Sequence, residues 1–363
     1  MTDDTTGIDF QVRRDDLRQH RFVPMGAPEL TLQPGQALLR IDRFAFTANN
    51  VTYAVAGDML YWKFFPAPEG WGHVPVWGFA DVVASRSDAA PEGLRVYGYF
   101  PVSTHLVVEP KGSGAGFTDA SAHRAELPFV YNSYASAPTG ASAQEEAMAA
   151  LFRPLFTTSF VLDHFIAAND GFGTDTVIVG SASSKTAFGM AYLLAKRDGV
   201  RSVGLTSGSN REFVEGLGCY DEVLTYDALE TLPADRPSVY VDMSGNTEVL
   251  SRLHHHLGDN MKHSAQVGVT HWEQRADVGA LPGAPPAFFF APTYIGELLK
   301  EHGPAGFNRM LDEALESVTA RLSGAIEVEE GRGRGDVARV YDTTLDGKTS
   351  PAVGHMLSMW EDA

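Results

Sequence analysis

Polar and apolar positions alternate along the first part of the chain, as they do in half-buried β-strands. The alternation begins at residue 37, directly after the turn signal Pro34-Gly35, and continues to residue 45. Similar short runs, each bounded by Pro, Gly or Asp, lie at residues 74–85, 94–100 and 105–109. We therefore predict a β-rich first domain.

After residue 150 the pattern changes to helices that alternate with continuous apolar strands. Residues 151–168 are typical of a helix, residues 176–179 of a buried strand, residues 187–196 of an apolar helix and residues 202–206 of a second strand. A strand, a helix and a strand within about 30 residues predict a right-handed βαβ unit with a parallel sheet. Three further buried strands are expected at residues 222–226, 238–242 and 264–269. The fold class that follows is α/β, with a doubly wound parallel sheet of the Rossmann type.

The remaining segments show weaker patterns. Residues 113–144 are rich in Gly, Ala and Ser, and we expect them to form a connection with little regular structure. Residues 294–322 are predicted to be helical, whereas residues 338–341 and 352–360 are strand-like, so that the tail rejoins the first domain. The division into domains is residues 1–150 for the β-rich domain, 151–324 for the Rossmann domain and 325–363 for the returning segment.

Charge and composition narrow the class of protein. Lys and Arg number 28 against 46 Asp and Glu, a net charge of −18, which argues against a nucleic-acid or anionic-membrane partner. The one cysteine, Cys219, excludes an intrachain disulfide and a cysteine-cluster metal site. No apolar run approaches the roughly 18 residues of a membrane span, and residues 1–6 lack both parts of a signal peptide. We expect a soluble protein of the cytoplasm.

The strongest local motif is the turn from Gly180 to Thr186, where the first strand of the βαβ unit meets its helix. Backbone N–H groups and the helix dipole favour a phosphate at such a point. The three-glycine dinucleotide fingerprint is not intact, but small residues still allow close approach and Lys185 adds positive charge. The expected cofactor ligands in this turn are Gly180, Ser181, Ser183, Ser184, Lys185 and Thr186. The alternative is an ordinary tight turn whose Ser and Thr side chains cap the helix.

The end of the second predicted strand bears on the choice between NADP and NAD. In NAD-selective sheets an acidic residue about 20 residues past the glycine turn binds the ribose 2′-OH, whereas an Arg accommodates a 2′-phosphate. Here the acidic residue is missing, and Ser207, Asn210 and Arg211 supply hydroxyl, amide and guanidinium donors. This pattern predicts NADP(H) as the cofactor. A polar loop that caps the next helix through Ser209 or Asn210 is the alternative, and both can hold together.

Several segments together, in this order, carry a resemblance to one known superfamily. They are Pro34–Ile41, Asn49–Tyr53 followed by Gly57-Asp58, Gly78–Ser85, Leu94–Gly98 and the Rossmann unit. Over nearly its whole length the chain resembles the medium-chain dehydrogenase/reductase superfamily, and within it the zinc-independent quinone-oxidoreductase-like branch. The Ser183–Thr186 turn and the segment Val241–Asn246 look like those of a divergent group of that superfamily. The resemblance implies a GroES-like first domain and a homodimer formed by edge pairing of the nucleotide-domain sheets.

A catalytic site is also implied. Without a metal, hydride delivery needs a hydrogen-bond donor near the substrate oxygen, and Tyr53 is the first candidate. Asn49 is expected to orient substrate or cofactor, and Thr158 resembles the superfamily's Thr near the nicotinamide. The alternatives are a core tyrosine with a satisfied hydroxyl and a helix-capping threonine. The expected cofactor site further includes Tyr226, Ser244 and Gly268.

Histidines and aromatic residues form the other conspicuous groups. His254–His256 and His263 are close in sequence, but adjacent helical residues point about 100° apart and cannot converge on one ion, so we predict a solvated helix end and no metal. The pair His271-Trp272 follows a predicted strand, where Rossmann ligands bind. Aromatic residues are dense at residues 61–65 and 288–290 and include Trp71 and Trp77. They suit either an apolar cleft or a core or dimer face.

The function that these observations favour is an NADPH-dependent, metal-independent reductase. Its substrate is expected to be a small apolar or planar carbonyl compound, which is a quinone, an enone or an enoyl thioester. The alternative is a non-catalytic NADPH-binding sensor or scaffold protein with the same fold.

Overall fold

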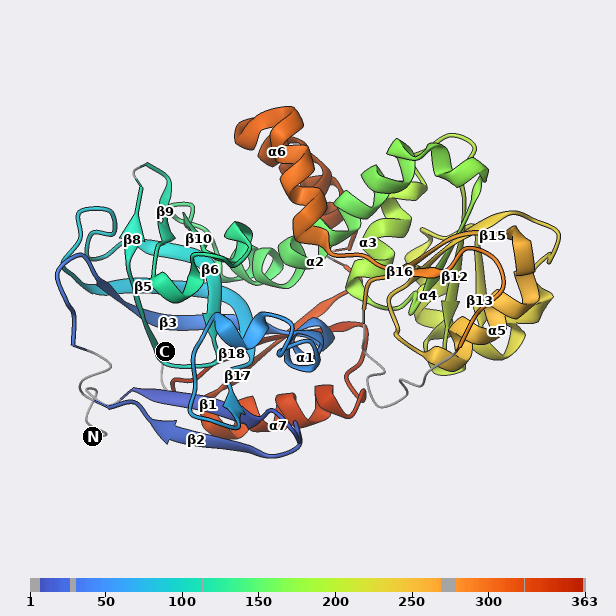
Figure 1. Cartoon of the computed structure of the whole chain (residues 1–363). Helices are drawn as coiled ribbons and strands as arrows, with labels where there is room; N and C mark the ends of the chain where they lie inside the picture. The colour runs from blue at the N-terminus through green and yellow to red at the C-terminus, as the bar shows by residue number, and fades with distance from the viewer. Residues whose placement is uncertain (1–6, 27–30, 113, 269–278, 323, 362–363) are drawn as a thin grey trace. The chain divides into compact units, whose positions relative to one another are not determined.

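The computed structural model describes residues 7–26, 31–112, 114–268, 279–322 and 324–361. The chain divides into two compact units. Unit 1 comprises Met1–Leu151, Val328–Thr349 and Val353–Ala363, and unit 2 comprises Phe152–Glu327 and Ser350–Ala352. The predicted α/β class is confirmed, because unit 1 is built mainly on antiparallel strands and unit 2 on a parallel sheet (Figure 1).

Unit 1 contains a nine-stranded sheet and a three-stranded sheet. The path of the large sheet is β17-β18-β3-β5-β6-β10-β9-β8, with β7 paired to β3. Its strands are β3 (Ala37–Phe46), β5 (Pro75–Ser85), β6 (Arg95–Pro101), β7 (His105–Val108), β8 (Pro110–Lys111), β9 (Gly116–Asp119), β10 (Ser133–Ser136), β17 (Glu327–Arg332) and β18 (Val353–Ser358). The small sheet has the order β2-β1-β4, from β1 (Ile8–Arg13), β2 (His20–Pro24) and β4 (Trp71–Gly72). Buried and half-buried positions alternate from Ala37 to Ile41, which confirms the strand predicted there.

Short helices connect the strands of unit 1. They are α1 (Ala48–Val55), α7 (Gly333–Leu345) and the 3-10 helices η2 (Tyr61–Lys63), η3 (Ala122–Arg124) and η4 (Phe129–Tyr131). The longer helix α2 (Ala143–Ala168) begins in unit 1 and continues into unit 2. In unit 1, the segments around α1, η2 and η4 contribute Tyr53, Tyr61 and Tyr131 to one buried aromatic cluster.

Unit 2 is a six-stranded sheet in the order β13-β12-β11-β14-β15-β16, in which every neighbouring pair is parallel. The strands are β11 (Thr176–Gly180), β12 (Arg201–Thr206), β13 (Glu222–Thr225), β14 (Ser238–Asp242), β15 (Met261–Gln266) and β16 (Pro286–Phe288). The chain moves outward from β11 to β13, then returns to the other side of β11 with β14. The direction therefore reverses between β11 and β14, the point at which doubly wound sheets bind ligands.

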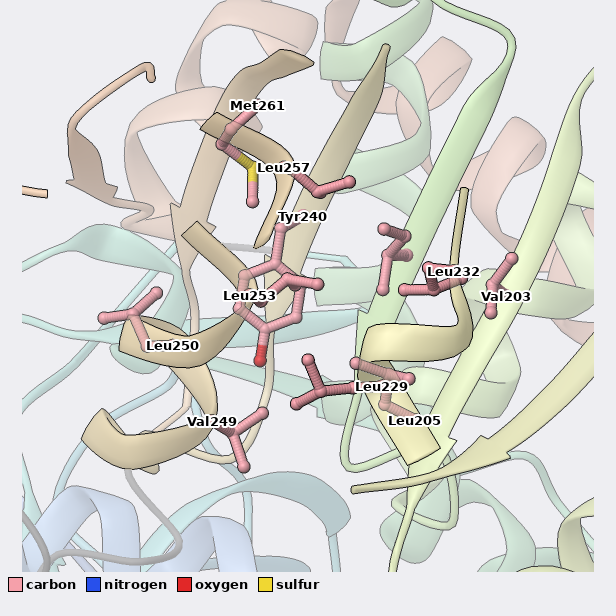
Figure 2. Close-up of a cluster of buried hydrophobic side chains, with 11 residues drawn as sticks. Val203, Leu205, Leu229, Leu232, Tyr240, Val249, Leu250, Leu253, Leu257 and Met261 are labelled. Atoms are coloured by element: carbon pink, nitrogen blue, oxygen red, sulfur yellow. The ribbon is translucent and has the colours of Figure 1, made fainter. Parts of the chain in front are cut away.

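A core of aliphatic side chains holds one face of this sheet against α5 (Thr247–Leu257) (Figure 2). Leu250, Leu253 and Leu257 recur at helical spacing and are buried with Ile178 and Val203 of the strands. Each such side chain contributes about 1.5–3 kcal/mol by its removal from water. This core fixes β11 and β14, and therefore the positions of their carboxyl ends, relative to α5.

The other helices of unit 2 are α3 (Lys185–Leu194), α4 (Arg211–Leu217) and α6 (Ala291–Leu322), with η5 (Asp170–Gly173), η6 (Gly208–Asn210), η7 (Tyr226–Thr231) and η8 (Gly258–Asn260). Helix α6 is interrupted at Gly303, whose φ is 69°, directly before Pro304. Its later half is joined to α3 by a hydrogen bond of 3.1 Å from Tyr192 Oη to the Ser317 carbonyl. Among the described residues, no helix has the length and apolar character needed to cross a membrane.

Two expectations about secondary structure are wrong. Residues 338–341 lie within α7, where Val337, Val340, Tyr341 and Thr344 are buried at helical spacing; a run of four residues is too short to distinguish the two periods. Residues 113–144 were expected to form a connection, but they include β9 and β10. Phe117 of β9 and Tyr134 of β10 stack with ring centroids 5.0 Å apart, and this packing outweighs the local Gly and Ser content.

Candidate functional site

The turn between β11 and α3 is fixed by its neighbours in the sheet. Ser181 has a φ of 52°, and its N–H donates to the Tyr226 hydroxyl at 3.1 Å. The N–H of Ala182 donates to the Leu205 carbonyl of β12 at 2.9 Å. Ser184 is the N-cap of α3, because its side chain accepts from the Ala187 N–H. Ser184 therefore caps the helix, as the alternative reading of this turn expected. The turn also lies at the N-terminus of α3, as the sequence predicted.

Gly180 lies in close approach to the side chain of Tyr240. A Cβ atom there would lie 2.6 Å from the Tyr240 hydroxyl, a distance that Cβ contacts do not reach. Tyr240 comes from β14, so Gly180 allows the two central strands to hold their polar ends together. This is the one position of the glycine fingerprint that the chain keeps.

The loop after β12 docks directly on the same turn. Asn210 Nδ2 donates to Ser183 Oγ at 3.1 Å, and Ser207 and Ser209 share a hydroxyl contact of 3.0 Å. Arg211 begins α4 and is exposed, with its Nε donating to Glu215 at 2.7 Å. An exposed pair of this kind contributes only about 0.2–1 kcal/mol, so the guanidinium can be redirected to a stronger anion. The two predicted cofactor segments thus form one polar surface.

Lys185 is the first residue of α3 and directly follows the N-cap Ser184. Its Nζ donates to the Pro351 carbonyl at 3.3 Å, within unit 2. Burial removes the ammonium from water and lowers the pKa of Lys185 to about 8. A cation at a helix N-terminus opposes the helix dipole, so an anion bound there would stabilise the charged form.

The carboxyl end of β14 holds a buried acid, Asp242. Its Oδ1 accepts from the Ser244 N–H, the Ser244 hydroxyl and the Gly245 N–H at 2.8, 2.7 and 3.0 Å. Its Oδ2 has no hydrogen-bond partner among the described residues, and the same is true of Thr206 Oγ1 at the end of β12. Burial raises the pKa of Asp242, which extends the pH range in which the carboxyl is uncharged.

Two further predicted cofactor residues meet at Asp242. Ser244 is fully buried, and its hydroxyl is directed to the Asp242 carboxylate. The N–H of Gly268 donates to the Asp242 carbonyl at 3.2 Å, and a Cβ at position 268 would lie 2.2 Å from the Met243 carbonyl oxygen. Both residues therefore shape the backbone at this edge of the sheet.

In unit 1, Tyr53 lies on α1 with a buried side chain. Trp77 Nε1 donates to the Tyr53 hydroxyl at 3.3 Å, and the ring of Tyr131 meets that of Tyr53 edge to face, with centroids 6.2 Å apart. Asn49 precedes Tyr53 by one helical turn, so the predicted pair is adjacent on one helix face. Burial raises the pKa of Tyr53 and keeps its phenol protonated.

The position of α1 is set by Asn50. Its Oδ1 accepts from the Thr47 N–H at 2.7 Å, and its Nδ2 donates to the Pro75 carbonyl at 2.7 Å. Thr47 completes a capping box with Asn50. Asn50 therefore fixes α1 to β5, and with it the position of the preceding residue, Asn49.

Thr158 belongs to unit 2, whereas Tyr53 and Asn49 belong to unit 1. It lies inside α2, so the alternative of helix capping is wrong. Its neighbour Ser159 donates to the Thr186 carbonyl at 2.7 Å and joins α2 to the start of α3. Thr158 therefore directly precedes the residue of α2 that contacts the candidate cofactor turn.

Histidines do not gather in the described part of the chain. No group of three or more His, Cys, Asp or Glu residues there is arranged to hold a metal ion. The expectation of a solvated helix end is wrong for His254, which is fully buried between the Pro282 carbonyl at 2.9 Å and the Ser264 hydroxyl at 3.0 Å. His271 and Trp272 lie outside the described residues.

The sequence analysis gave no role to Tyr131, Asp242, Thr206 or Pro351, and it named Trp77 only among the dense aromatic residues. No local motif marks Tyr131, Thr206 or Pro351, which lie in a 3-10 helix, at a strand end and in a loop. Asp242 alone carried a sequence signal, as the last residue of a predicted strand beside the central one.

Comparison with known proteins agrees with this geometry. The chain shares its fold with solved structures that match nearly its whole length. CurA from Vibrio vulnificus in complex with NADPH is 13% identical with a TM-score of 0.61, over 97% of this chain and 98% of that chain. The yhdH oxidoreductase from Salmonella enterica in complex with NADP is 14% identical with a TM-score of 0.52, over 97% and 99%. CurK enoyl reductase is 14% identical with a TM-score of 0.56, over the same shares.

By sequence, the chain belongs to the family described as "Protein of unknown function (DUF2855)", whose model matches residues 44–350. No curated protein matches it.

Proposed function

We propose that this protein is an NADPH-dependent, metal-independent reductase that transfers hydride to a quinone, an enone or an enoyl thioester. The observation that carries the proposal is the hydrogen bond from Asn210 to Ser183. It joins the turn after β11 to the loop after β12, at the edge where doubly wound sheets bind ligands. The loop, residues 207–211, contains no acidic residue. Solved structures of similar fold contain NADPH or NADP, which supports the choice of cofactor.

The residues at this edge fit a dinucleotide 2′-phosphate. The backbone at Ser183, Ser184, Lys185 and Thr186 starts α3 and would hold the pyrophosphate, with the Lys185 ammonium as a counter-ion. Ser207, Asn210 and Arg211 would hold the 2′-phosphate. Gly180, Ser181, Tyr226, Ser244 and Gly268 would shape the binding edge through their backbone and packing contacts.

The cofactor supplies a hydride when it is bound. The chain's own role in catalysis is then to hold a proton near the substrate oxygen. Tyr53 is suited to this because burial raises the pKa of its phenol and Trp77 Nε1 fixes its oxygen by a hydrogen bond. Asn49 is proposed to orient the substrate, and Thr158 to position the nicotinamide.

We further propose that the protein is cytoplasmic and forms a homodimer. Its one cysteine, Cys219, is buried and free, and a chain with a single cysteine and hence no internal disulfide suits a reducing compartment. Strand β16 lies at the edge of the parallel sheet, and its Phe288 is 54% exposed and stacked on Phe290 with centroids 6.2 Å apart. An exposed apolar strand at a sheet edge favours pairing with a second copy.

A sensor or scaffold that binds NADPH without turnover is the second candidate. The N–H groups of Ser181 and Ala182 are already satisfied inside the fold, which leaves fewer backbone donors for a pyrophosphate. The two functions are separated by NADPH oxidation in the presence of enones, quinones and enoyl thioesters. Oxidation that is accelerated by one acceptor class supports the reductase, and NADPH binding without acceleration by any of them supports the sensor.

A further inference from the structure

Two hydrogen bonds attach helix α1 to strand β5 in unit 1. Asn50 Nδ2 donates to the Pro75 carbonyl at 2.7 Å. Trp77 Nε1 donates to the Tyr53 hydroxyl at 3.3 Å. Asn50 and Tyr53 are three residues apart on the helix and are therefore neighbours on its surface. Because α1 is held to β5 at two points, it cannot turn about its own axis, and the direction of the Tyr53 side chain is fixed with it.

The sheet determines where the Trp77 indole lies. Trp77 of β5 is paired with Tyr99 of β6 and with Ala45 of β3. Its ring centroid lies 5.1 Å from that of Tyr99 and 5.6 Å from that of Tyr97, on which it stacks with an angle of 21° between the rings. Ring contacts between neighbouring strands restrict the rotamer of the indole. The indole N–H is therefore held in one direction before any substrate binds.

The hydrogen bond between Trp77 and Tyr53 has only one possible polarity. An indole N–H can donate but not accept, so the Tyr53 oxygen is the acceptor. A donor aimed at this oxygen stabilises it more after its own proton has left, because the oxygen is then charged. Burial raises the pKa of Tyr53, and the hydrogen bond from Trp77 opposes this rise. Trp77 therefore favours a proton transfer that burial alone would hinder.

We propose that Trp77 is a positioning residue that acts on the reaction through the Tyr53 oxygen. The inference rests on the proposed function. In that reaction the substrate accepts a hydride and forms a C–H bond, and the Oη–H bond of Tyr53 breaks as its proton passes to the substrate. The Trp77 N–H stays bonded to the phenolate oxygen, and a proton from solvent then restores the phenol. The reaction consumes one NADPH, one substrate and one proton, and it releases NADP+.

A structural role for Trp77 would act in a different way. The indole packs on Tyr97 and Tyr99, so its loss through packing alone would lower turnover whether or not the Tyr53 hydroxyl is present. The N–H, in contrast, acts only while that hydroxyl is there to accept it. The two roles are therefore separated by removing Trp77 and the Tyr53 hydroxyl singly and together.

The test is a double-mutant cycle of Trp77→Phe and Tyr53→Phe in the full-length protein. Steady-state NADPH oxidation with a quinone, an enone and an enoyl thioester gives kcat and KM, and the thermal midpoint confirms that each variant folds. We expect Trp77→Phe alone to lower kcat about five- to thirtyfold, the equivalent of about 1–2 kcal/mol for a hydrogen bond to an oxygen that becomes charged. In the Tyr53→Phe background the same substitution should change kcat less than about twofold, and KM for NADPH should stay within about twofold throughout.

Tyr99→Phe is the matched control for packing. The Tyr99 ring contacts those of Trp77 and Tyr53, with centroids 5.1 and 5.5 Å apart, but its hydroxyl has no hydrogen-bond partner among the described residues. This variant should keep the kcat of the wild type within about twofold. If Trp77→Phe does not fold, Trp77→Met carries the same cycle, because methionine also lacks an N–H and adapts to irregular space.

The outcomes separate the inference from the proposed function. If the wild type turns over and Trp77→Phe keeps its kcat, or loses the same factor with and without the Tyr53 hydroxyl, Trp77 is structural and the inference fails while the reductase function stands. A loss in Tyr99→Phe as large as that in Trp77→Phe would show an effect of packing and would also overturn the inference. If the wild type oxidises no NADPH with any acceptor class, the proposed function fails and the inference fails with it.

Discussion

Asn210 donates from Nδ2 to the Ser183 hydroxyl across 3.1 Å, and this contact joins the loop after β12 to the turn that starts α3. Residues separated by 27 positions in sequence thereby form one polar surface at the carboxyl ends of two adjacent parallel strands. The charge and hydrogen-bonding capacity of this surface lead to the first prediction.

Replacement of Arg211 should weaken NADPH binding selectively. Loss of the guanidinium in Arg211→Ala removes a charged hydrogen bond to the 2′-phosphate, worth about 1.5–3 kcal/mol, and leaves NADH unaffected. Titration of cofactor fluorescence measures both affinities. Glu215→Gln is the matched control, since it removes the partner of Arg211 at 2.7 Å without removing the cation, and it should not weaken NADPH binding. Equal losses for NADPH and NADH would contradict the assignment.

The affinity for NADPH should fall as the pH rises through about 8. Burial lowers the pKa of Lys185 to about 8 in the free protein, and a bound pyrophosphate would favour the protonated amine. Above this pH, binding must take up a proton, so the affinity falls by up to roughly tenfold per pH unit. The change is measured by titrations between pH 6 and about 9.5. In Lys185→Met the fall should be absent, and an unchanged pH dependence in that variant would show that Lys185 does not contact the cofactor.

Tyr53→Phe should abolish most turnover and spare NADPH binding. The substitution removes only the hydroxyl that holds the proton, and the ring still fills its place among Tyr61 and Tyr99. A loss of about 10²–10⁴ in kcat is expected for a general acid. The measurement pairs NADPH oxidation with a binding titration on the same sample. Wild-type turnover in the variant would mean that Tyr53 is a core residue only.

Two tyrosines near Arg124 should respond oppositely to loss of the hydroxyl. Tyr134 Oη accepts from Arg124 Nη1 at 3.2 Å and donates to the Tyr99 carbonyl at 2.8 Å, so Tyr134→Phe leaves a buried cation with one acceptor fewer. We expect a loss of about 1–3 kcal/mol in the free energy of unfolding. Tyr99→Phe removes a buried hydroxyl without a described partner and should be neutral or stabilising. Denaturant unfolding curves measure both, and a larger loss for Tyr99→Phe would contradict the hydrogen-bond assignment.

Regular patterns were sufficient to predict the sheet of unit 2 and the strand at residues 37–45. Continuous apolar strands separated by amphipathic helices leave few alternative folds, and the turn at Gly180 follows from its place between β11 and α3. The helix at residues 338–341 was missed because four residues carry no period. Likewise, His254 was misjudged because its burial depends on Pro282 and Ser264. Contacts such as Trp77 with Tyr53 arise only when β5 and α1 are assembled, so single-sequence patterns do not contain them.

The central claim is that the edge of the parallel sheet binds NADPH in preference to NADH. Parallel fluorescence titrations of the wild-type protein with the two cofactors test it without knowledge of the substrate. The account predicts saturable NADPH binding with a dissociation constant at least about tenfold lower than that for NADH, the equivalent of about 1.4 kcal/mol. Binding of neither cofactor, or equal binding of both, would contradict it.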